Sequence, residues 1–564
     1  MVITKNSNIN ARVVFPRAEG PSRSHEEPQQ GDQVPINMSM VKDLEQPEPV
    51  MTDDKAMDDN STSSFSNSAK QQHGISTTVT PIVGAATGPF AKFTKWLESI
   101  GVEARGLDRV PESERTSTSY SAQTRFWFSV NMSVSSLVNG SLGQQFYTLK
   151  GTTSIAIIIP MTALGCCCSA YVATLGPPTG LRTLALTRFA AGRFTFVLGI
   201  INALIQISYG VTTAIAGAQV LRAVNHDLSL IVGIVIISAV VFVICVFGLR
   251  WAHYFERWCF IPCFIIYVII LGLGSRGHYD LQAGADTQDK GAALVGDVLS
   301  FAGICFSIAS AWTSIAADYN TYAPSNSSRG KIFAATWLGT FIPICFINIS
   351  GAALWSITEP SYVAAREQDG LGGILGAVLE PSKAFGKILL VILAFSTIAA
   401  NIPNTYSGAL SLQSLHPILL KVPRVVFVII VTAAYVAAAC AGREHFSEIV
   451  ANFAAILSYY TAGLFALLLL EFGWFRRRNG ILGKIDPDEW CNWKVLPPGY
   501  ACAMTFCITV GAAVVSMATV FWTGPIAKLV TEPYGGDLGF EFSFVFTFVF
   551  FFIFRTIEIR YFKR

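Results

Sequence analysis

Amide and hydroxyl side chains recur within an otherwise apolar stretch, residues 391–415, which reads VILAFSTIAANIPNTYSGALSLQSL. Such groups cost several kcal/mol in hydrocarbon unless something hydrogen-bonds to them. A proline in the stretch removes a backbone donor and frees a carbonyl one turn earlier, which predicts a local opening of the helix. A helix of this kind fits the wall of a cavity that a polar guest enters. The residues that we expect to line it are Ser396, Thr397, Asn401, Pro403 and Asn404.

The composition indicates that this stretch crosses a membrane. Of the 564 residues, 52% are hydrophobic and 14% are charged, whereas soluble proteins carry about 25% charged residues. The net charge of +3 is too small to indicate nucleic-acid binding. The 12 cysteines have no zinc-type spacing with histidine, so we interpret them as packing residues and predict no metal site. The chain also lacks a G-x-S-x-G motif and a phosphate loop, which argues against an enzyme and predicts no cofactor.

The first part of the chain is polar. Residues 1–88 are rich in Ser, Gln, Asn, Pro and acidic residues without periodicity, which predicts a disordered cytoplasmic N-terminal tail. Residues 89–125 include FAKFTKWLESI, whose apolar residues recur at helical spacing, followed by a polar linker. We expect an amphipathic helix that lies on the surface of the lipid bilayer.

About twelve apolar segments follow, each long enough for the roughly 20 residues that cross the hydrocarbon. The first eight occupy residues 126–413, and spans nine to twelve with a short C-terminal tail occupy residues 414–564. We place the spans near 126–148, 152–174, 195–220, 228–249, 257–274, 294–317, 332–357, 384–413, 423–441, 447–472, 499–522 and 540–560. These spans predict an all-α polytopic membrane protein. Loops on the side of the two termini carry more Lys and Arg than loops on the other side, which predicts cytoplasmic N- and C-termini.

Small and polar residues interrupt two of the predicted spans. Span one reads FWFSVNMSVSSLVNGSLGQQFY, and its Asn139 and Gly140 predict local unwinding because both residue types tolerate left-handed backbone. Span six reads GDVLSFAGICFSIASAWTSIAADY and contains Trp312 and Thr313. Interrupted helices five apart in order are typical of two inverted five-helix repeats, whose half-helix ends form a binding site near mid-membrane. The alternative is that Ser and Gly only allow close helix packing.

Span three adds an aromatic hydroxyl in ALIQISYGVTTAIAGAQVL. Tyr209 and Thr213 are four residues apart and therefore share one face of a helix. Together they could stack a flat heterocycle and hydrogen-bond its edge. The alternative is a tyrosine packed between helices with its hydroxyl on a neighbouring carbonyl, and a tryptophan such as Trp312 has the same two interpretations.

Several further stretches follow one another in a fixed order over most of the chain. They are GVEARGLDRVPESERT, LGPPTGLRTLALTRFAAG, SYGVTTAIAGAQVLRAVN, WTSIAADYNTYAP, ATWLGTFIP, ANIPNTYSGALSLQSL and NFAAILSYYTAG. In these stretches the chain resembles the nucleobase:cation symporter family, specifically its fungal purine–cytosine permease branch. The resemblance implies a leucine-transporter-like fold of five plus five inverted helices and two extra. It also implies proton-coupled uptake of purine bases and cytosine across the plasma membrane.

The resemblance also assigns binding residues to spans one, three, six and eight. Carried over by motif, these substrate-binding residues are Ser135, Asn139, Tyr209, Thr213, Trp312, Thr313, Asn401, Pro403 and Asn404. In the expected mechanism, the ring of the substrate lies between Trp312 and Tyr209, and the helices rock around this site to alternate access.

Three positions depart from the family pattern. Span three has Tyr209 and Thr213 where the pattern has Trp and Asn, and Ala400 stands where the pattern has an additional Asn. These changes remove donors and acceptors suited to the edge of a base, and a site rejects ligands that leave its polar groups unpaired. The alternatives are therefore a vitamin (pyridoxine-like) or another nucleobase as the substrate, and a transport-inactive sensor.

The coupling ion is expected to be H+ from the resemblance. Ser396 and Thr397 lie one turn before Asn401 and could line a small cation site together with carbonyls of span one. Carboxylates within the spans lie near their ends. Of these, Asp318 is interpreted first as a helix-end residue and second as a proton carrier.

Overall fold

The computed structural model describes residues 92, 96, 99, 106–247, 249–283, 288–416, 418–477, 480–483, 485–532 and 535–564. The chain divides into two units, Met1–Thr78 and Val79–Arg564, and every described residue belongs to the second. The tail predicted for residues 1–88 lies outside the described residues. Of the predicted surface helix, Lys92, Trp96 and Ser99 are described, and all three are helical.

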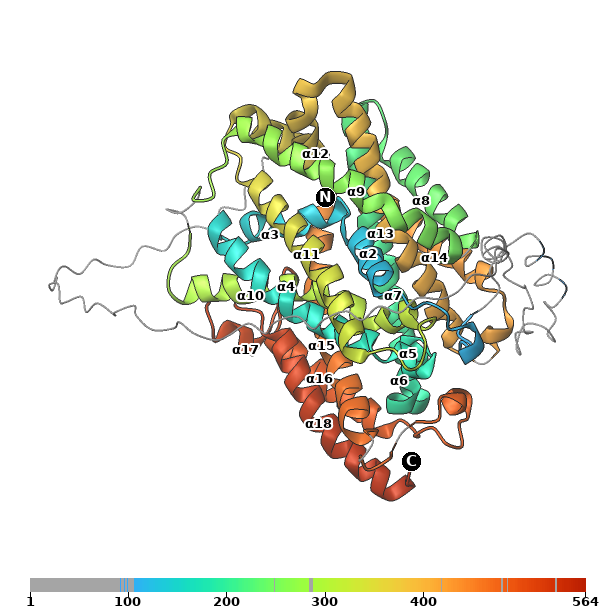
Figure 1. Ribbon diagram of the computed structural model, residues 1–564. Helices are drawn as coiled ribbons and strands as arrows, with labels where there is room; N and C mark the ends of the chain where they lie inside the picture. The colour runs from blue at the N-terminus through green and yellow to red at the C-terminus, as the bar shows by residue number, and fades with distance from the viewer. Residues whose placement is uncertain are drawn as a thin grey trace, which may run out of the picture. The chain divides into compact units, whose positions relative to one another are not determined.

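Long helices dominate the described residues (Figure 1). They form because hydrocarbon offers no hydrogen-bond partners, so a spanning backbone must satisfy its own polar groups. The long helices are α2 (Tyr120–Asn131), α3 (Ser135–Gln145), α4 (Gly151–Ala173), α7 (Thr195–Val224), α8 (Leu230–Phe247), α9 (Leu249–Gly274), α10 (Ala292–Ser310), α11 (Arg329–Trp355), α12 (Pro360–Leu379), α13 (Lys383–Ser414), α14 (Arg424–Gly442), α15 (Phe446–Leu470), α16 (Tyr500–Ser516) and α18 (Gly539–Phe562).

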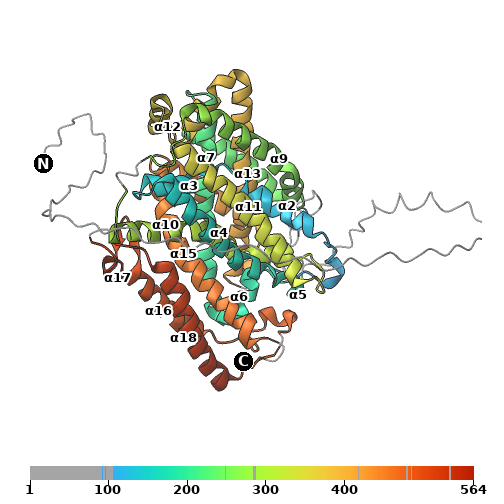
Figure 2. The same ribbon diagram turned by 60° about the vertical axis from the view of Figure 1, so that its left-hand side comes forward.

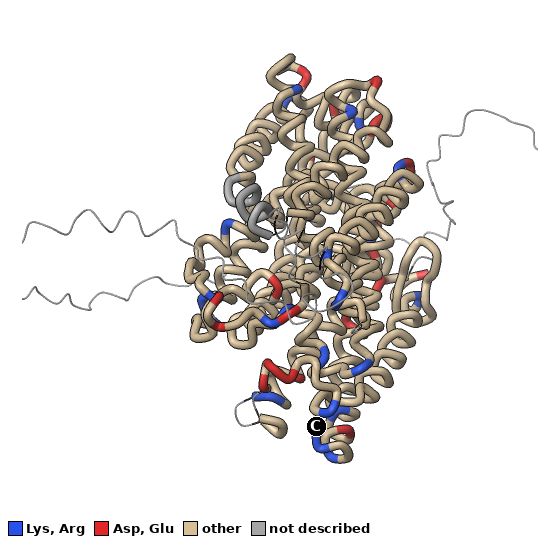
Figure 3. The backbone as a smooth tube through the Cα atoms, turned by 90° about the vertical axis from the view of Figure 1, so that its right-hand side faces the viewer, with Lys and Arg blue, Asp and Glu red and all other residues tan. Residues whose placement is uncertain are grey.

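Short elements connect the long helices. They are α5 (Gly176–Thr179), α6 (Thr183–Ala191), α17 (Pro525–Lys528), the 3₁₀ turns η1 (Glu112–Glu114), η2 (Gly192–Phe194), η3 (Ser275–Gly277), η4 (Ala311–Ser314), η5 (Ala316–Asn320), η6 (Glu380–Ser382), η7 (Leu419–Lys421) and η9 (Pro487–Cys491), and the π-helical turn η8 (Glu471–Phe475). Strands β1 (Ala518–Thr519) and β2 (Trp522–Thr523) pair antiparallel, with Ala518 opposite Thr523. Charged residues are sparse along the helices and gather in the connections and at helix ends (Figure 3).

Ten helical segments of the described residues are long and apolar enough to cross a membrane. Two more of the predicted spans correspond to the pair α2 and α3 and to α16, which is a shorter apolar helix. The prediction of an all-α polytopic membrane protein is confirmed. Helices α2, α3 and α4 pack along α11, and α16 and α18 pack against each other beside α15 (Figures 1 and 2).

Spans one and six are both interrupted, as the sequence predicted. In span one, α2 ends at Asn131 and α3 begins at Ser135. In span six, α10 ends at Ser310 and the chain continues as η4 and η5, with Ile315 between them at φ −137°. The matched breaks fit two repeats of the same architecture.

The predicted position of the break in span one is wrong. Asn139 and Gly140 lie inside the regular helix α3. A Cβ on Gly140 would come within 1.8 Å of the backbone oxygen of Asn348 in α11, and one on Gly351 of α11 within 2.0 Å of the Leu137 oxygen. Gly140 therefore serves close packing of α3 on α11, which was the alternative interpretation.

Helix α13 continues through Pro403 without interruption, so the predicted local opening is also wrong. Proline is tolerated inside a membrane helix when neighbouring helices pack closely around it. Helix α13 is enclosed in this way by α7, α8, α9 and α14, and its central turns, including Pro403, are buried.

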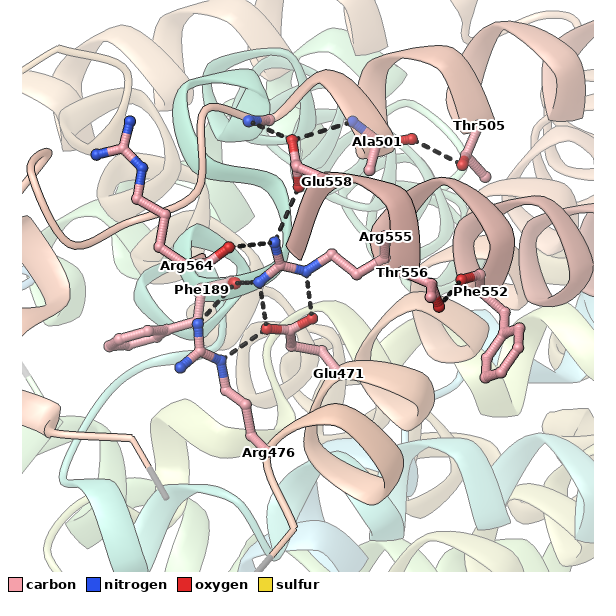
Figure 4. Close-up of polar contacts among 11 residues, drawn as sticks. Phe189, Glu471, Arg476, Ala501, Thr505, Phe552, Arg555, Thr556, Glu558 and Arg564 are labelled. Atoms are coloured by element: carbon pink, nitrogen blue, oxygen red, sulfur yellow. Dashed lines mark hydrogen bonds and ion pairs between the residues drawn. The ribbon is translucent and has the colours of Figure 1, made fainter. Parts of the chain in front are cut away.

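A buried network of charges fixes the last helices to the rest of the bundle (Figure 4). Arg555 of α18 donates from Nε and Nη2 to the two carboxylate oxygens of Glu471, each at 3.0 Å, and from Nη1 to Glu558 at 2.9 Å. Arg476 donates to Glu471 at 2.6 Å, and both arginines donate to the carbonyl of Phe189 at the end of α6. Glu471 and Arg555 are fully buried, so the charges satisfy one another instead of meeting solvent.

Candidate functional site

The two interrupted spans meet through one hydrogen bond. Trp312 of η4 donates from its indole Nε1 to Oδ1 of Asn131 at 2.9 Å, and Asn131 donates from Nδ2 to the carbonyl of Trp127 at 2.8 Å. The rings of Trp312 and Trp127 contact edge to face, with centroids 5.4 Å apart. The predicted site residue Trp312 therefore lies at the break of span one, and Asn131 joins it there. Asn131 was not among the predicted site residues, although an asparagine inside an apolar span is itself a signal for a polar site.

The span-eight helix reaches the same break. The backbone N–H of Val134 donates to the hydroxyl of Ser396 at 3.1 Å, and that hydroxyl donates to the carbonyl of Leu393 at 2.6 Å. The hydroxyl of Ser133, in the break, lies 3.0 Å from that of Ser135, the first residue of α3. Ser135 and Ser396 were predicted from separate motifs, and the structure places both beside the interruption of span one.

Thr397 faces a different helix from Ser396. Its hydroxyl donates to the carbonyl of Ala394 at 2.7 Å, and a Cβ on Gly217 of α7 would lie 2.6 Å from that hydroxyl oxygen. The two candidate ion-coupling hydroxyls are therefore adjacent in sequence, while one contacts span one and the other packs on α7.

Asn401 is the most unusual side chain of α13. It is 0% exposed, and neither its amide nitrogen nor its amide oxygen has a hydrogen-bond partner among the described residues. Buried polar groups are nearly always hydrogen-bonded, so such an orphaned amide requires an explanation such as a bound water or ligand. Asn404 lies in the next turn and is also buried. Helix α13 thus carries unused donors and acceptors in the stretch that the sequence selected.

On α7, the predicted residues are engaged locally. The hydroxyl of Thr213 donates to the carbonyl of Tyr209 at 2.7 Å, and the ring of Tyr209 packs edge to face on Phe453 at 5.1 Å. Gln206, one turn earlier, donates to Asn202 at 3.3 Å and to Ser314 at 3.4 Å, while its buried Oε1 has no partner among the described residues. Gln206 thus connects span three to the break in span six, and sequence reasoning left it unassigned although it stands in the same polar run.

Two further predicted residues lie away from this cluster. Thr313 is fully buried, and its hydroxyl is 3.3 Å from that of Ser169 in α4, so it is engaged on the side of η4 that packs on α4. Asn139 is half-buried on α3. Asp318 accepts the backbone N–H of Thr183 at 2.7 Å and so caps the first turn of α6, which agrees with its interpretation as a helix-end residue.

A small pocket lies where α3, α7 and α11 end and α15 begins. Its polar lining includes Ser141, Gln145, Gln219 and Ser447, and α12 contributes Gly370 at a kink. Aromatic side chains fill the space beside α2. Phe126 of α2 stacks on Tyr319 with ring centroids 4.6 Å apart, and the Tyr319 hydroxyl lies 3.4 Å from that of Ser407. The bundle is therefore hollowed beside the ends of α3 and α7 and packed with aromatic rings beside α2.

Comparison with known proteins identifies the family to which this chain belongs. Residues 109–469 match the family described as permease for cytosine/purines, uracil, thiamine and allantoin. A purine-cytosine permease of Emericella nidulans is 33% identical over 481 residues, which are 84% of this chain and 92% of that protein. A vitamin B6 transporter of Saccharomyces cerevisiae is 28% identical over 524 residues, covering 84% of this chain and 90% of that protein.

A solved structure shows the fold. A nucleobase-cation-symport-1 family transporter, in a closed conformation with bromovinylhydantoin bound, matches with a TM-score of 0.62 at 14% identity and covers 81% of this chain and 95% of that chain. The prediction of a leucine-transporter-like fold is confirmed. The chain therefore belongs to the family of permeases for cytosine/purines, uracil, thiamine and allantoin, and it is a multi-pass membrane transporter and not an enzyme.

Proposed function

We propose that this protein takes up a purine base, cytosine or a related flat heterocycle across the plasma membrane by alternating access. The observation that carries the proposal is Asn401, a fully buried amide with both polar atoms unpaired among the described residues. An amide offers one acceptor and two donors in a plane, which is the pattern that the edge of a nucleobase requires. The similarity to the purine-cytosine permease of Emericella nidulans supports the same substrate class.

The substrate enters from the side of the pocket between α3, α7 and α11. With the termini in the cytoplasm, as the distribution of Lys and Arg in the loops supports, α3 and α7 end on the outer face. The pocket is then the outer vestibule, and the aromatic contact of Phe126 with Tyr319 closes the inner side. Trp312 provides the stacking surface, while Asn401 and Asn404 provide hydrogen bonds to the edge of the ring.

The coupling ion in this proposal is H+. A sodium site at this place would use the Ser396 oxygen as a ligand. That oxygen already accepts the backbone N–H of Val134, so a cation bound there would have one lone pair of the oxygen and a positive dipole beside it. Thr397, the other hydroxyl of such a site, packs on α7.

A vitamin is the second candidate substrate. Thr213 stands where the permease pattern has an amide, and its hydroxyl is committed to the Tyr209 carbonyl, so α7 offers fewer free groups to the edge of a base. The vitamin B6 transporter of Saccharomyces cerevisiae, at 28% identity, supports this alternative.

One uptake experiment tests these proposals. Cells that lack their own carriers would express the full chain and be given radiolabelled cytosine, adenine, uracil or pyridoxine, with and without a protonophore and with sodium or choline in the medium. We expect saturable uptake of cytosine or adenine that the protonophore abolishes. Uptake of pyridoxine alone would establish the second candidate, and a requirement for sodium would contradict proton coupling. A chain that reaches the cell surface and transports none of the four compounds would support a sensor.

A further inference from the structure

The hydrogen bond between Asn131 and Trp312 gives Asn131 a task that the proposed function does not assign. We infer that Asn131 is a positioning residue, which holds the indole of Trp312 at the angle required for stacking on the substrate. The inference rests on the proposed function in one respect, namely that Trp312 contacts the substrate.

Asn131 is held at both ends of its amide. Its Oδ1 accepts from Trp312 and its Nδ2 donates to the carbonyl of Trp127, and the residue is 5% exposed. Turning the amide over would set its donor against the indole N–H and its acceptor against the Trp127 carbonyl. The hydrogen-bond network therefore permits a single orientation. Because Asn131 is the last residue of α2, its backbone is also fixed by the helix.

The backbone around Trp312, in contrast, is less regular than the helix that holds Asn131. Trp312 belongs to a single 3₁₀ turn, and the chain leaves helical geometry at Ile315. The ring is half-buried, and its described aromatic contact is with Trp127, edge to face at 69°. The torsion that turns an indole about its Cβ–Cγ bond is soft. Apolar side chains around span one pack against the ring, and the indole N–H adds a directional bond to Asn131 that sets the angle of its plane.

The consequence is a specific effect on substrate affinity. Asn131 accepts the indole N–H at the edge of the ring, so it leaves the stacking face to the substrate and acts through Trp312. Without the bond, the ring samples several angles, and only a fraction of the molecules present the face that stacks. The apparent affinity then falls in proportion to that fraction.

A double-mutant cycle with Asn131→Ala and Trp312→Phe tests the inference. Phenylalanine keeps a stacking ring and removes the N–H, so each single variant breaks the same bond from a different side. We expect each to raise KM for the transported substrate about tenfold, with the maximal rate per surface molecule unchanged within about twofold. The double variant is expected to be no worse than the poorer single variant, because the bond is lost only once.

Trp337→Phe is the matched control. The indole of Trp337 donates to the carbonyl of Ala163 at 3.2 Å, on the face of α11 that packs on α4. The control should leave KM unchanged. Multiplicative effects of the two single variants, or a loss of surface expression in Asn131→Ala together with a normal KM in Trp312→Phe, would overturn the inference.

Trp312→Ala separates this inference from the proposed function. If Trp312→Ala leaves KM unchanged, Trp312 does not contact the substrate and the proposed site is wrong. If Trp312→Ala raises KM while Asn131→Ala and Trp312→Phe do not, the site stands and the positioning role of Asn131 is wrong.

Discussion

The backbone N–H of Val134 donates to the Ser396 hydroxyl at 3.1 Å, so the break in span one is held open by a side chain 262 residues later in the chain. A residue between two half-helices has no hydrogen-bond partner from its own helix, and span eight supplies one. This contact places the interrupted helix against α13, where the unpaired amide of Asn401 lies one to two turns further along.

Removing the Ser396 hydroxyl should weaken this break. Ser396→Ala leaves the buried N–H of Val134 without an acceptor, which costs about 1–3 kcal/mol. We expect a lower unfolding temperature of the purified protein and a lower uptake rate per surface molecule. Thr397→Ser, which keeps the bond to the Ala394 carbonyl and loses only a methyl group, is the control and should lose less stability and uptake than Ser396→Ala. Wild-type stability and uptake in Ser396→Ala would show that the contact does not hold the break.

Adding one methyl group at Gly140 should separate α3 from α11. In Gly140→Ala the new Cβ would meet the Asn348 carbonyl at 1.8 Å, and overpacking of this kind costs about 1–3 kcal/mol or more. The unfolding temperature should fall clearly. Gly272→Ala on α9 has no neighbouring atom within 4 Å, so the same change there should leave stability unchanged or raise it slightly. Equal stability of the two variants would refute the close packing.

Breaking the buried charge network should be far more costly than breaking a surface pair. Glu471→Gln removes the carboxylate that Arg555 and Arg476 share, and leaving buried charges uncompensated costs about 3–5 kcal/mol. Glu444→Gln breaks the exposed pair with Arg443, which is worth about 0–1 kcal/mol. Denaturation of the two variants in detergent measures the difference. A loss for Glu471→Gln no greater than that for Glu444→Gln would contradict the role given to the network.

Asp537, in the connection before α18, should make stability depend on pH. Burial raises the pKa of this carboxyl to about 6, against the opposing effect of hydrogen bonds from Tyr459 and Gly539. The folded state then binds the proton more tightly than the unfolded state, whose aspartate pKa is about 4. The stabilisation is therefore present below about pH 4 and is lost as the pH rises to about 6, on the order of 3 kcal/mol.

The measurement is the unfolding temperature of the wild type, Asp537→Asn and Asp280→Asn at several pH values between pH 4 and pH 7. Asp537→Asn should lose this part of the slope, whereas Asp280→Asn, at an exposed aspartate that accepts the backbone N–H of Gln282, should keep it. The same slope in wild type and Asp537→Asn would show that Asp537 does not titrate in this range.

Much of this architecture could be predicted from local sequence, because hydrophobic length and interrupting polar residues are local properties. The prediction of span eight at 384–413 agrees with α13, Lys383–Ser414, within a residue at each end. The position of the break in span one could not be predicted, because Gly140 has its partner in α11 and Val134 has its partner in α13. Both partners become visible only when distant helices are assembled.

The direction in which individual side chains point also could not be predicted from the sequence. Trp312 and Thr313 are neighbours in η4, and Trp312 reaches Asn131 while Thr313 contacts Ser169 of α4. A change from 3.6 to 3.0 residues per turn shifts which side chains share a face, and the sequence does not mark where that change occurs. Gln206 was overlooked for the same reason, since its role depends on its contact with Ser314 of the second break.

The central claim is that the unpaired amide of Asn401 binds the transported substrate, and its most direct test is the KM of Asn401→Ala for that substrate. Asn452 of α15 is the matched control, because its amide is occupied by the Glu448 carbonyl and the Val520 N–H. We predict that Asn401→Ala raises KM about tenfold or more at normal surface expression, while Asn452→Ala leaves KM unchanged. A wild-type KM in Asn401→Ala would contradict the account.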